Sequence, residues 1–406
     1  RLDKPYARGR DGRLHPVSWD EALKSLATAL RKAKPTAIGA IAGNQADAES
    51  LFALKSLMTR LGSPNLDCRQ DGAKIGGNRA GYLFNSTIAG IDDADALLII
   101  GSNPRIEAAV LNARIRRNWL SSRMPVAVVG PKVDLTYHAD FLGQDPAILD
   151  VLADGTHQFA SKLKKAKRPM IIIGMGALVR ADGAAMLGKA RQIAESYGVV
   201  TKEWNGFNVL HNAAARVGGL DLGFLPSRGG MDIAAMGKAA KAGKLDLLWL
   251  LGADEIDFEP FASSFVVYQG HHGDAGAHHA YLVLPGAAYT EKDGIYVNTE
   301  GRVQYATRAA FPPGDAREDW TIIRAVSGAV GKSIGFDTLA ELRGALCADH
   351  PHFADADAIV PAKWTSFGGR AKLSAEPVRH AFDNFYMTCA ISRASETMAE
   401  CVRASS

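Results

Sequence analysis

The stretch that decides the fold is residues 282–320, which read LVLPGAAYTEKDGIYVNTEGRVQYATRAAFPPGDAREDW. A short apolar run of strand length opens it and ends at Pro285-Gly286. A charged turn at 291–294 leads into a second β-rich run at 295–298. The chain then breaks at 312–314 and enters a helix whose first turn is acidic. The stretch therefore predicts two short strands followed by a helix.

Outward from this stretch, short apolar strands alternate with helices. A capping box, Ser18 and Glu21, opens a helix over 18–33, and a second amphipathic helix over 47–61 ends at Gly62. Further strands are predicted at 36–42, 96–100, 126–129, 170–173, 199–201, 245–251 and 265–268, and further helices at 105–120, 147–163, 183–197 and 231–241. Such alternation is typical of parallel sheets covered on both faces, so we expect an α/β protein with two Rossmann-like, doubly wound domains.

Length and composition limit the class of protein. The 406 residues exceed the roughly 250 to 300 at which single cores usually divide, so at least two domains are expected. With 47% hydrophobic and 22% charged residues the chain can bury a large core. The net charge of +4 is small. The densest basic patches, Arg114 to Arg117 and Lys162 to Arg168, are interpreted as solvated helix faces, and no nucleic-acid partner is expected.

No apolar run approaches the ~18 to 20 residues needed to cross a bilayer, and the longest, such as 245–251, have the length of strands. We therefore expect no direct membrane insertion, and any membrane association has to come through partner subunits. The chain begins at Arg1 with neither an initiator methionine nor a signal-peptide pattern, so we expect a processed or partial piece of a longer protein.

The cysteines indicate reduced thiols and no metal cluster. Cys68, Cys347, Cys389 and Cys401 show no CxxC spacing, and iron–sulfur clusters and structural zinc normally take closely spaced cysteines. Their scattered placement in a large core favours free thiols in a cytosol-like or matrix-like compartment over disulfides.

Glycines at predicted strand ends stand where α/β folds bind ligands: Gly43, Gly101, Gly130, Gly174 and Gly252. Tight turns from strand to helix need glycine with or without a ligand. None opens a complete G-x-G-x-x-G motif, because the nearest match, Gly174-Met175-Gly176, fails at Val179. We interpret these glycines as turn residues.

A loop dense in histidine holds His271, His272, His278 and His279 around Asp274. Four imidazoles and a carboxylate suit zinc or copper, but consecutive histidines seldom both reach one ion. We favour a structural loop over a metal site. Trp19, Trp119, Trp249 and Trp320 fall within predicted helices or strands and are expected in the core.

The stretch 282–320 closely resembles a signature of the molybdopterin oxidoreductase superfamily. The opening Arg1-Leu2 with Pro5, the segment PVSWDEAL at 16–23 and the turn Gly101-Ser102-Asn103-Pro104 resemble other parts of that signature. Near the end, FYMT at 385–388 and the segment 391–401 resemble the C-terminal part of one member, the large iron–sulfur subunit of respiratory complex I. The resemblance covers almost the whole chain.

This resemblance implies a formate dehydrogenase-like architecture in which a second α/β domain is inserted into the first. We expect the first domain at 1–142 and 270–345, the inserted domain at 143–269, and an extended tail at 346–406 with a short helix at 391–401.

Catalytic members of the superfamily place a cysteine, selenocysteine or serine on the metal just beyond an arginine, and their turn equivalent to 101–104 contacts the pterin. Here Cys68 precedes Arg69, and Gln70, Asp71 and Gly72 follow it. The resemblance therefore places no soft thiolate at the metal position. The relatives also use a final β-barrel domain to hold the second pterin, and we expect no counterpart of it in the roughly 60 residues that follow the α/β region.

We therefore expect a redox-inactive structural part of the large iron–sulfur subunit of proton-translocating NADH:quinone oxidoreductase (complex I). No residue is assigned a catalytic, cofactor-binding or metal role, and the iron–sulfur clusters are expected in an N-terminal region that this chain lacks. The implied partners are the other subunits of the peripheral arm, on the matrix side of the mitochondrial inner membrane or the cytoplasmic side of a bacterial membrane. The alternatives are a catalytic molybdenum or tungsten bis-pterin subunit of the formate dehydrogenase type, or a free-standing Rossmann-like binding module.

Overall fold

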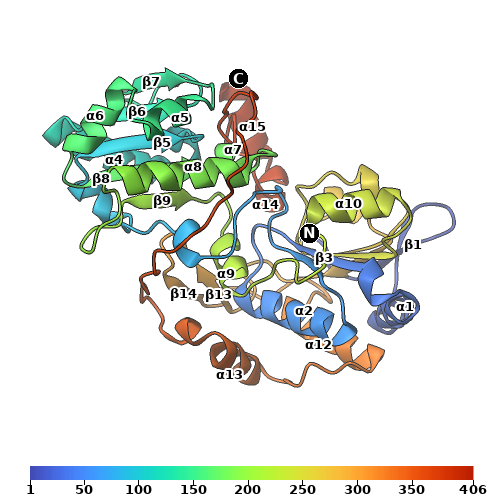
Figure 1. Cartoon of the computed structure of the whole chain (residues 1–406). Coiled ribbons are helices and arrows are strands. Elements are labelled where there is room, and N and C mark those ends of the chain that lie inside the picture. Colours follow the sequence, from blue (N-terminus) through green and yellow to red (C-terminus); the bar gives the residue numbers. More distant parts are fainter. Residues whose placement is uncertain (406) are drawn as a thin grey trace.

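Two separate sheets organise the chain in the computed structural model, which describes residues 1–405 (Figure 1). The first sheet has seven strands in the order β2-β1-β12-β11-β10-β3-β4. Their bounds are β1 (Tyr6–Arg8), β2 (Leu14–Pro16), β3 (Ile38–Ala42), β4 (Asn65–Asp67), β10 (Leu247–Leu251), β11 (Phe265–Gly270) and β12 (Leu282–Pro285). Strands β4, β3, β10, β11 and β12 run parallel, and β1 and β2 extend the edge as an antiparallel pair.

The first sheet is covered on both faces, as its continuous apolar strands predict. Leu247, Trp249 and Leu251 of β10 share one hydrophobic cluster with α1 (Trp19–Lys32), α2 (Ala48–Leu61) and α12 (Asp319–Val330). Leu248 and Leu250 point to the other face and pack with α10 (Ile233–Lys241). The expected capping box at Ser18 is present, and α2 ends at Gly62 in the left-handed conformation, φ 76°.

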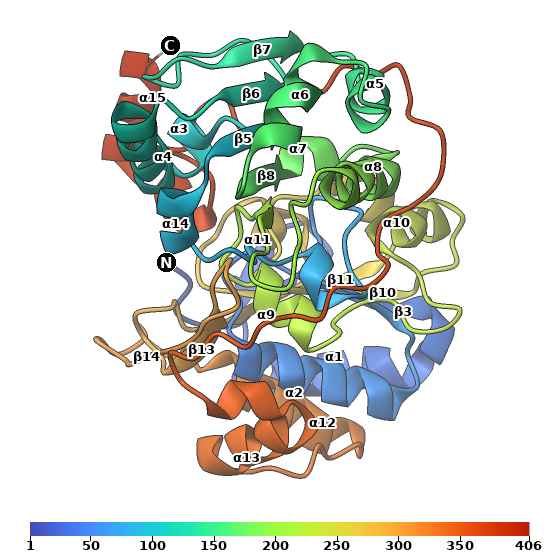
Figure 2. The same ribbon diagram turned by 60° about the vertical axis from the view of Figure 1, so that its left-hand side comes forward.

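The second sheet contains five parallel strands in the order β7-β6-β5-β8-β9. Their bounds are β5 (Ala96–Ile100), β6 (Val126–Val129), β7 (Asp140–Gly143), β8 (Pro169–Gly174) and β9 (Phe207–Leu210). Figure 2 shows α4 (Ala109–Ser122) on one side of this sheet and α5 (Ile148–Ala153), α6 (Gln158–Lys165) and α8 (Gly183–Ser196) on the other. This sheet is the second doubly wound layer that the alternation predicts.

The expected domain boundaries disagree with the strand pairing. The expectation placed 143–269 in the inserted domain, but β5, β6 and β7 pair with β8 and β9, and β10 and β11 return to the first sheet. The expected boundary between 142 and 143 even falls inside β7. All these strands are short and apolar, so their sequences say that they are buried but not which sheet they join. The insertion itself is present, because every strand of the second sheet lies between β4 and β10 in the chain.

Three predicted elements also differ in detail. The strand expected at 199–201 forms only an isolated bridge from Val200 to Asn205, and β9 follows it. The helix expected at 105–120 is two helices, α3 (Pro104–Glu107) and α4, divided at Ala108, whose φ is −154°. The helix expected at 147–163 is divided into α5 and α6 by a turn with Gly155 at φ 79°.

The remaining elements connect and cover the sheets. The stretch 282–320 supplies β12, then the hairpin of β13 (Gly294–Val297) and β14 (Val303–Ala306), and then α12. The shorter helices are α7 (Met175–Leu178), α9 (Arg216–Asp221), α11 (Ala275–His279), α13 (Leu339–Asp349), α14 (Ala390–Arg393) and α15 (Glu396–Ser405), with 3-10 turns at Pro35–Ala37, Arg79–Gly81, Ala89–Asp93, Glu259–Phe261 and Pro351–Ala354.

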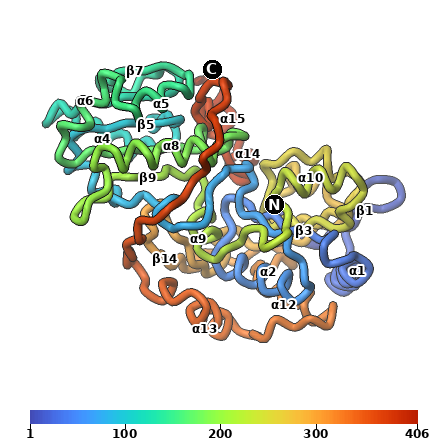
Figure 3. The backbone as a smooth tube through the Cα atoms, viewed as in Figure 1, coloured from blue at the N-terminus to red at the C-terminus, as the bar shows by residue number. Residues whose placement is uncertain are grey.

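The C-terminal tail leaves α13, passes along the second sheet and ends in α14 and α15 (Figure 3). It has no sheet of its own, and its apolar side chains dock onto the α/β layers. Phe367 and Val378 are buried in the main cluster, and the rings of Trp364 and Phe207 lie 5.3 Å apart. The one helix expected at 391–401 is the pair α14 and α15.

Trp249 and Trp320 lie in the core as expected, and Trp19 and Trp119 are half-buried. Trp320 packs in the cluster that joins α12 to α1 and α2, and its indole nitrogen donates to Glu318 Oε2 at 2.8 Å.

Trp320→Ala is expected to lower the free energy of unfolding by about 3 to 5 kcal/mol, because it leaves a cavity in this cluster. Urea unfolding of the purified chain measures the change. The control is Phe311→Ala, since Phe311 is 78% exposed and should shift stability by only about 0.5 kcal/mol. Equal effects of the two substitutions would contradict the assigned role of Trp320.

Candidate functional site

The carboxyl edges of the two parallel sheets are where an α/β fold places its ligand. In the first sheet the backbone closes this edge: a Cβ atom on Gly43 would lie 1.9 Å from the carbonyl oxygen of Gly252. In the second sheet a Cβ atom on Gly174 would lie 2.5 Å from Ser102 Cβ. These glycines are therefore required by the close approach of neighbouring turns, as the turn interpretation predicts.

The turn Gly101-Ser102-Asn103-Pro104 begins α3 at the edge of the second sheet, and Glu107 occupies its polar groups. Glu107 Oε2 accepts from Ser102 Oγ at 2.8 Å, and Oε1 accepts from the backbone N–H groups of Asn103 at 3.0 Å and Ala381 at 3.1 Å. The turn is thus bound to a carboxylate of its own helix and to the C-terminal tail.

Residues 374–393, which we call the C-terminal strap, cross the carboxyl edge of the second sheet. The strap residue Val378 donates its N–H to the carbonyl of Gln144, just after β7, at 2.8 Å. After β8, the carbonyl of Arg379 lies so close that a Cβ atom on Gly176 would be 2.1 Å from it. Chain atoms of the strap therefore fill the space beside this edge.

Arg180 holds the beginning of the strap. Its guanidinium pairs with Asp182 at 2.8 Å and donates to the carbonyls of Glu376 at 2.5 Å and Pro377 at 3.0 Å. Ser374 completes the contact by donating its N–H to Asp182 Oδ2 at 2.7 Å. The side chain of Arg180 is 4% exposed, so this is a buried and fully used guanidinium.

Arg393 fixes the other end of the strap at the carboxyl edge of the first sheet. It contacts three carboxylates: Asp274 at 2.6 Å, Glu255 at 2.9 Å and Asp254 at 3.2 Å. Asp254 and Glu255 follow β10, and Asp274 follows β11. Burial raises the pKa of Asp254 to about 6, and the Arg393 guanidinium acts against this rise by favouring the charged form. The strap therefore bridges the ligand-binding edges of both sheets.

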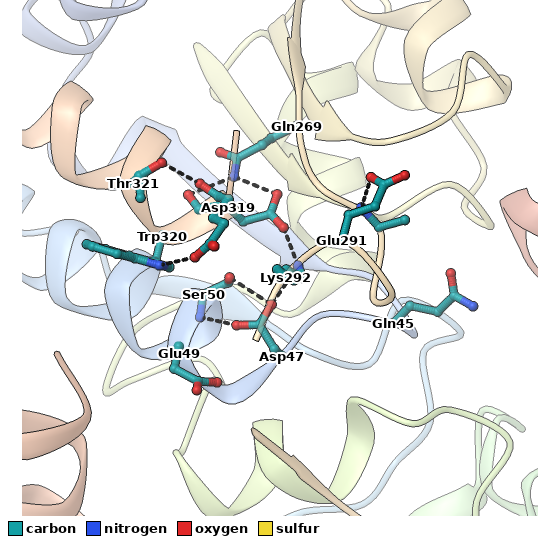
Figure 4. A network of polar contacts seen from close by, with 12 residues as sticks. Gln45, Asp47, Glu49, Ser50, Gln269, Glu291, Lys292, Asp319, Trp320 and Thr321 are labelled. Carbon is teal, nitrogen blue, oxygen red and sulfur yellow. Dashed lines mark hydrogen bonds and ion pairs between the residues drawn. The ribbon is translucent and has the colours of Figure 1, made fainter. Parts of the chain in front are cut away.

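A buried ionic centre lies beneath the edge of the first sheet (Figure 4). Lys292 Nζ lies 2.6 Å from Asp47 Oδ2 and also contacts Asp319 Oδ2. Asp47 caps α2 by accepting from the N–H of Ser50 at 2.7 Å, and Asp319 accepts from Gln269 Nε2 at 2.9 Å. The centre thus joins α2, β11, α12 and the turn of the 282–320 stretch.

Charge fixes the protonation of this centre. Burial alone would raise the pKa of Asp47, but the Lys292 ammonium holds it below its usual value. Burial would likewise lower the pKa of Lys292, and the two carboxylates raise it well above its usual value. The cavity beside the centre, between Gln45, Gly252, Gln269 and Lys292, measures about 20 Å³. It has room for about one water molecule.

Glu49 lies two residues after Asp47 in the first turn of α2 and is a second buried carboxyl group beside the centre. Burial and the neighbouring Asp47 raise its pKa to about 7, although it accepts from the N–H of Ile295 at 2.7 Å and from Arg343 Nε at 2.8 Å. Its side chain is 1% exposed. The protein therefore carries a carboxyl group whose ionisation is costly at neutral pH.

Cys68 lies in the packed layer between β4 and α9. A Cβ atom on Gly219 would lie 2.8 Å from Cys68 Cβ, and the Cys68 N–H donates to the carbonyl of Phe224 at 3.0 Å. Burial raises the pKa of the thiol to about 12. Metals and electrophiles take the thiolate, and this thiol stays protonated at neutral pH.

The four histidines of the glycine-rich loop do not converge. His271 Nδ1 and His272 Nδ1 lie 2.6 Å apart, and burial lowers their pKa values to about 3 and about 4. His279 stacks on Phe258 at 4.6 Å. Within residues 1–405, no three His, Cys, Asp or Glu side chains are arranged to hold a metal ion.

Two family models cover most of the chain. Residues 1–329 match the model for molybdopterin oxidoreductase, and residues 358–401 match the model for the C-terminal region of the G subunit of NADH-ubiquinone oxidoreductase. The chain belongs to the molybdopterin oxidoreductase family. Its homologues within that family are subunits of NADH dehydrogenases.

One relative is the G subunit of NADH-quinone oxidoreductase from Rickettsia felis, 45% identical over 405 residues, which covers 100% of this chain and 58% of the relative. Another is NADH dehydrogenase [ubiquinone] iron-sulfur protein 1, mitochondrial, of Solanum tuberosum, 42% identical over 406 residues, which covers 99% of this chain and 54% of the relative. The chain therefore spans little more than half the length of the curated relatives it matches.

Solved structures agree on the fold. The formyltransferase/hydrolase complex (FhcABCD) of Methylorubrum extorquens gives a TM-score of 0.56 at 18% identity, covering 81% of this chain and 99% of that one. Acetylene hydratase of Pelobacter acetylenicus gives a TM-score of 0.52 at 14% identity, covering 82% of this chain and 62% of that one. The expected α/β architecture of the molybdopterin oxidoreductase type is confirmed.

Glu49→Gln is expected to flatten the pH dependence of stability. The pKa of Glu49 is about 7 in the folded chain against an ordinary 4.5, so the folded state holds the extra proton between these values. The free energy of unfolding therefore falls as the pH rises through this window, by on the order of 2 kcal/mol, and the amide that replaces the carboxyl group cannot titrate.

Urea unfolding at about pH 5 and about pH 8 measures this loss. Glu203→Gln, which alters an exposed side chain, is the control. Its free energy of unfolding should fall between the two pH values by as much as that of the unaltered chain. If the free energy of unfolding of the Glu49→Gln chain falls by the same amount as that of the unaltered chain, Glu49 ionises as it does in water.

Arg393→Leu is expected to release the strap while both sheets stay folded, because three carboxylates lose their cation. Chymotrypsin should then cut beside the exposed Phe385 and Tyr386 at least about fivefold faster, since cleavage follows the opened population. Arg403→Leu, an exposed arginine of α15, is the control. Equal cleavage of the two variants would show that Arg393 does not hold the strap.

Proposed function

We propose that this chain is the redox-inactive structural part of the large iron–sulfur subunit of a proton-translocating NADH:quinone oxidoreductase, in its peripheral arm. The observation that carries the proposal is the C-terminal strap, which covers the ligand-binding edges of both sheets. The chain performs no bond chemistry in this role. It supports the neighbouring cluster-bearing region through which electrons pass from NADH and flavin towards the quinone.

The residues at the carboxyl edges do not fit a pterin cofactor. The turn 101–104 is bound to Glu107 and the strap, and Arg379 lies against Gly176. Cys68 is packed between β4 and α9 with its Cβ against Gly219, so its thiol faces the core and not the carboxyl edges. These contacts support a scaffold that binds no cofactor of its own.

The names of the relatives support membership of the complex. The Rickettsia felis and Solanum tuberosum relatives belong to an NADH-quinone oxidoreductase and an NADH dehydrogenase, the second as an iron-sulfur protein. We infer that the partners of this chain are the other subunits of the peripheral arm.

No helix within residues 1–405 is long and apolar enough to cross a membrane. We propose that the chain reaches the membrane only through those subunits, on the mitochondrial matrix side or the bacterial cytoplasmic side.

Two measurements on chain purified from molybdate-supplemented cells test the proposal. Elemental analysis is expected to find molybdenum and tungsten far below one atom per chain, and affinity purification from its own cells is expected to recover NADH-oxidising subunits. A molybdenum enzyme prepared in parallel controls for metal supply. Stoichiometric molybdenum or tungsten would establish the alternative catalytic subunit, and recovery without NADH-oxidising partners would exclude membership of the complex.

A further inference from the structure

A groove of about 730 Å³ runs along α1, at the outer margin of the molecule (Figure 1). Its strand side contains Asp246 just before β10, Phe265 at the start of β11 and Tyr281 just before β12. These strands run parallel, so the strand side lies at the amino edge of the first sheet, away from the edge that the strap covers. The helix side is one face of α1, with residues three or four positions apart: Glu21, Lys24, Ser25, Thr28, Ala29 and Lys32.

The apolar part of this groove is only partly covered. The rings of Phe265 and Tyr281 lie 4.6 Å apart, and Tyr281 is 44% exposed. Phe265 is half-buried, as are Ser25 and Ala29 on α1. The small side chains of Ser25 and Ala29 leave the surface of α1 low between the rings and the lysines, so a second helix can approach it closely.

The charge around the groove is mainly positive. Glu21 and Asp246 are the acids of the lining, and Glu21 Oε2 already accepts from the N–H and the Oγ of Ser18, each at 2.8 Å. Four exposed lysines lie in the lining or within two residues of it in the chain, and none forms an ion pair within residues 1–405: Lys24, Lys32, Lys34 and Lys244. This excess of unpaired cations favours an acidic occupant.

The length of the groove decides the kind of occupant. Its lining extends from Glu21 to Ala33, which is about 18 Å along the axis of α1. Lys24 and Lys32 are about 12 Å apart along the same axis, too far for one phosphate or carboxylate to contact both. A helical segment of about 12 residues has the matching length, and its side chains two turns apart have the matching spacing.

We propose that this groove docks an acidic amphipathic helix of a partner protein. The apolar stripe of that helix lies on Phe265 and Tyr281, and two of its carboxylates, about two turns apart, pair with Lys24 and Lys32. This is the mode in which an amphipathic helix places its apolar face in a hydrophobic groove.

Photo-cross-linking of the full chain in its own cells tests the proposal. Tyr281 is replaced by the photoreactive p-benzoylphenylalanine, and the cross-linked peptide is sequenced by mass spectrometry. The expected product joins this chain to a segment of another protein with apolar residues at helical spacing and carboxylates about seven or eight residues apart. The same replacement at Tyr289, which is 49% exposed and outside the groove, is the control and should not give this product.

Two double variants separate pairing with the groove lysines from a general effect of charge. Lys24→Glu combined with Lys32→Glu is expected to lower the yield of the product at least about fivefold, because carboxylates then face carboxylates. Lys164→Glu combined with Lys165→Glu makes the same change in net charge at exposed positions of α6 and should leave the yield unchanged.

A further variant fills the groove without changing charge. Thr28→Trp places an indole over the middle of α1 at an exposed position, so the chain should fold while the partner helix is displaced and the product is lost.

The proposal is overturned if no cross-linked protein is found at Tyr281, if the product is a second copy of this chain, or if the partner segment lacks the helical spacing or the paired carboxylates. Equal yields from the two double variants would overturn it as well. An acidic helical segment whose yield falls in the variant at Lys24 and Lys32, and not in the variant at Lys164 and Lys165, supports it.

Discussion

The rest of the structure depends on the buried contact of Lys292 with Asp47 and Asp319. This one ammonium joins a helix cap near the start of the chain, the turn of the 282–320 stretch and the first residue of α12. Removing one partner from such a buried set typically costs about 3 to 5 kcal/mol, because the remaining charges stay out of water. The centre therefore sets where α2 and α12 lie on the sheet, and with them the layer that contains Trp320.

The strap makes the second long-range connection, again through cations paired with carboxylates. Arg180 holds it beside the second sheet and Arg393 holds it at the first. Between these points the strap contributes mainly backbone groups, which fill a crevice that α/β proteins usually leave for a ligand. The same segment lines a pocket of about 370 Å³ through Phe382 and Phe385, so the closure of one ligand edge creates another concave surface.

Short-range sequence patterns predict much of this fold, but they do not predict which distant segments pair with one another. The capping box at Ser18, the helix ending at Gly62 and most buried strands follow from short-range rules. The domain boundaries at 142 and 269 were wrong. Short apolar strands of similar length show by their sequence that they are buried, but not which of the two sheets they join. Lys292 reads as part of a charged turn, and nothing near it indicates partners 245 residues upstream at Asp47 or 27 residues downstream at Asp319. Arg393 shows no local signal that it binds three carboxylates.

The interleaved order of strands sets a sequence of events during synthesis. The second sheet is complete once β9 has emerged, whereas the first sheet lacks its central strand β10 until later in the chain. Domains generally fold as units while the chain grows, so the second sheet and its helices can fold before the first sheet, into which they are inserted. The strap follows both. The ribosome thus delivers two open strand edges before the segment that covers them, so the edges are sealed only after both sheets have been synthesised.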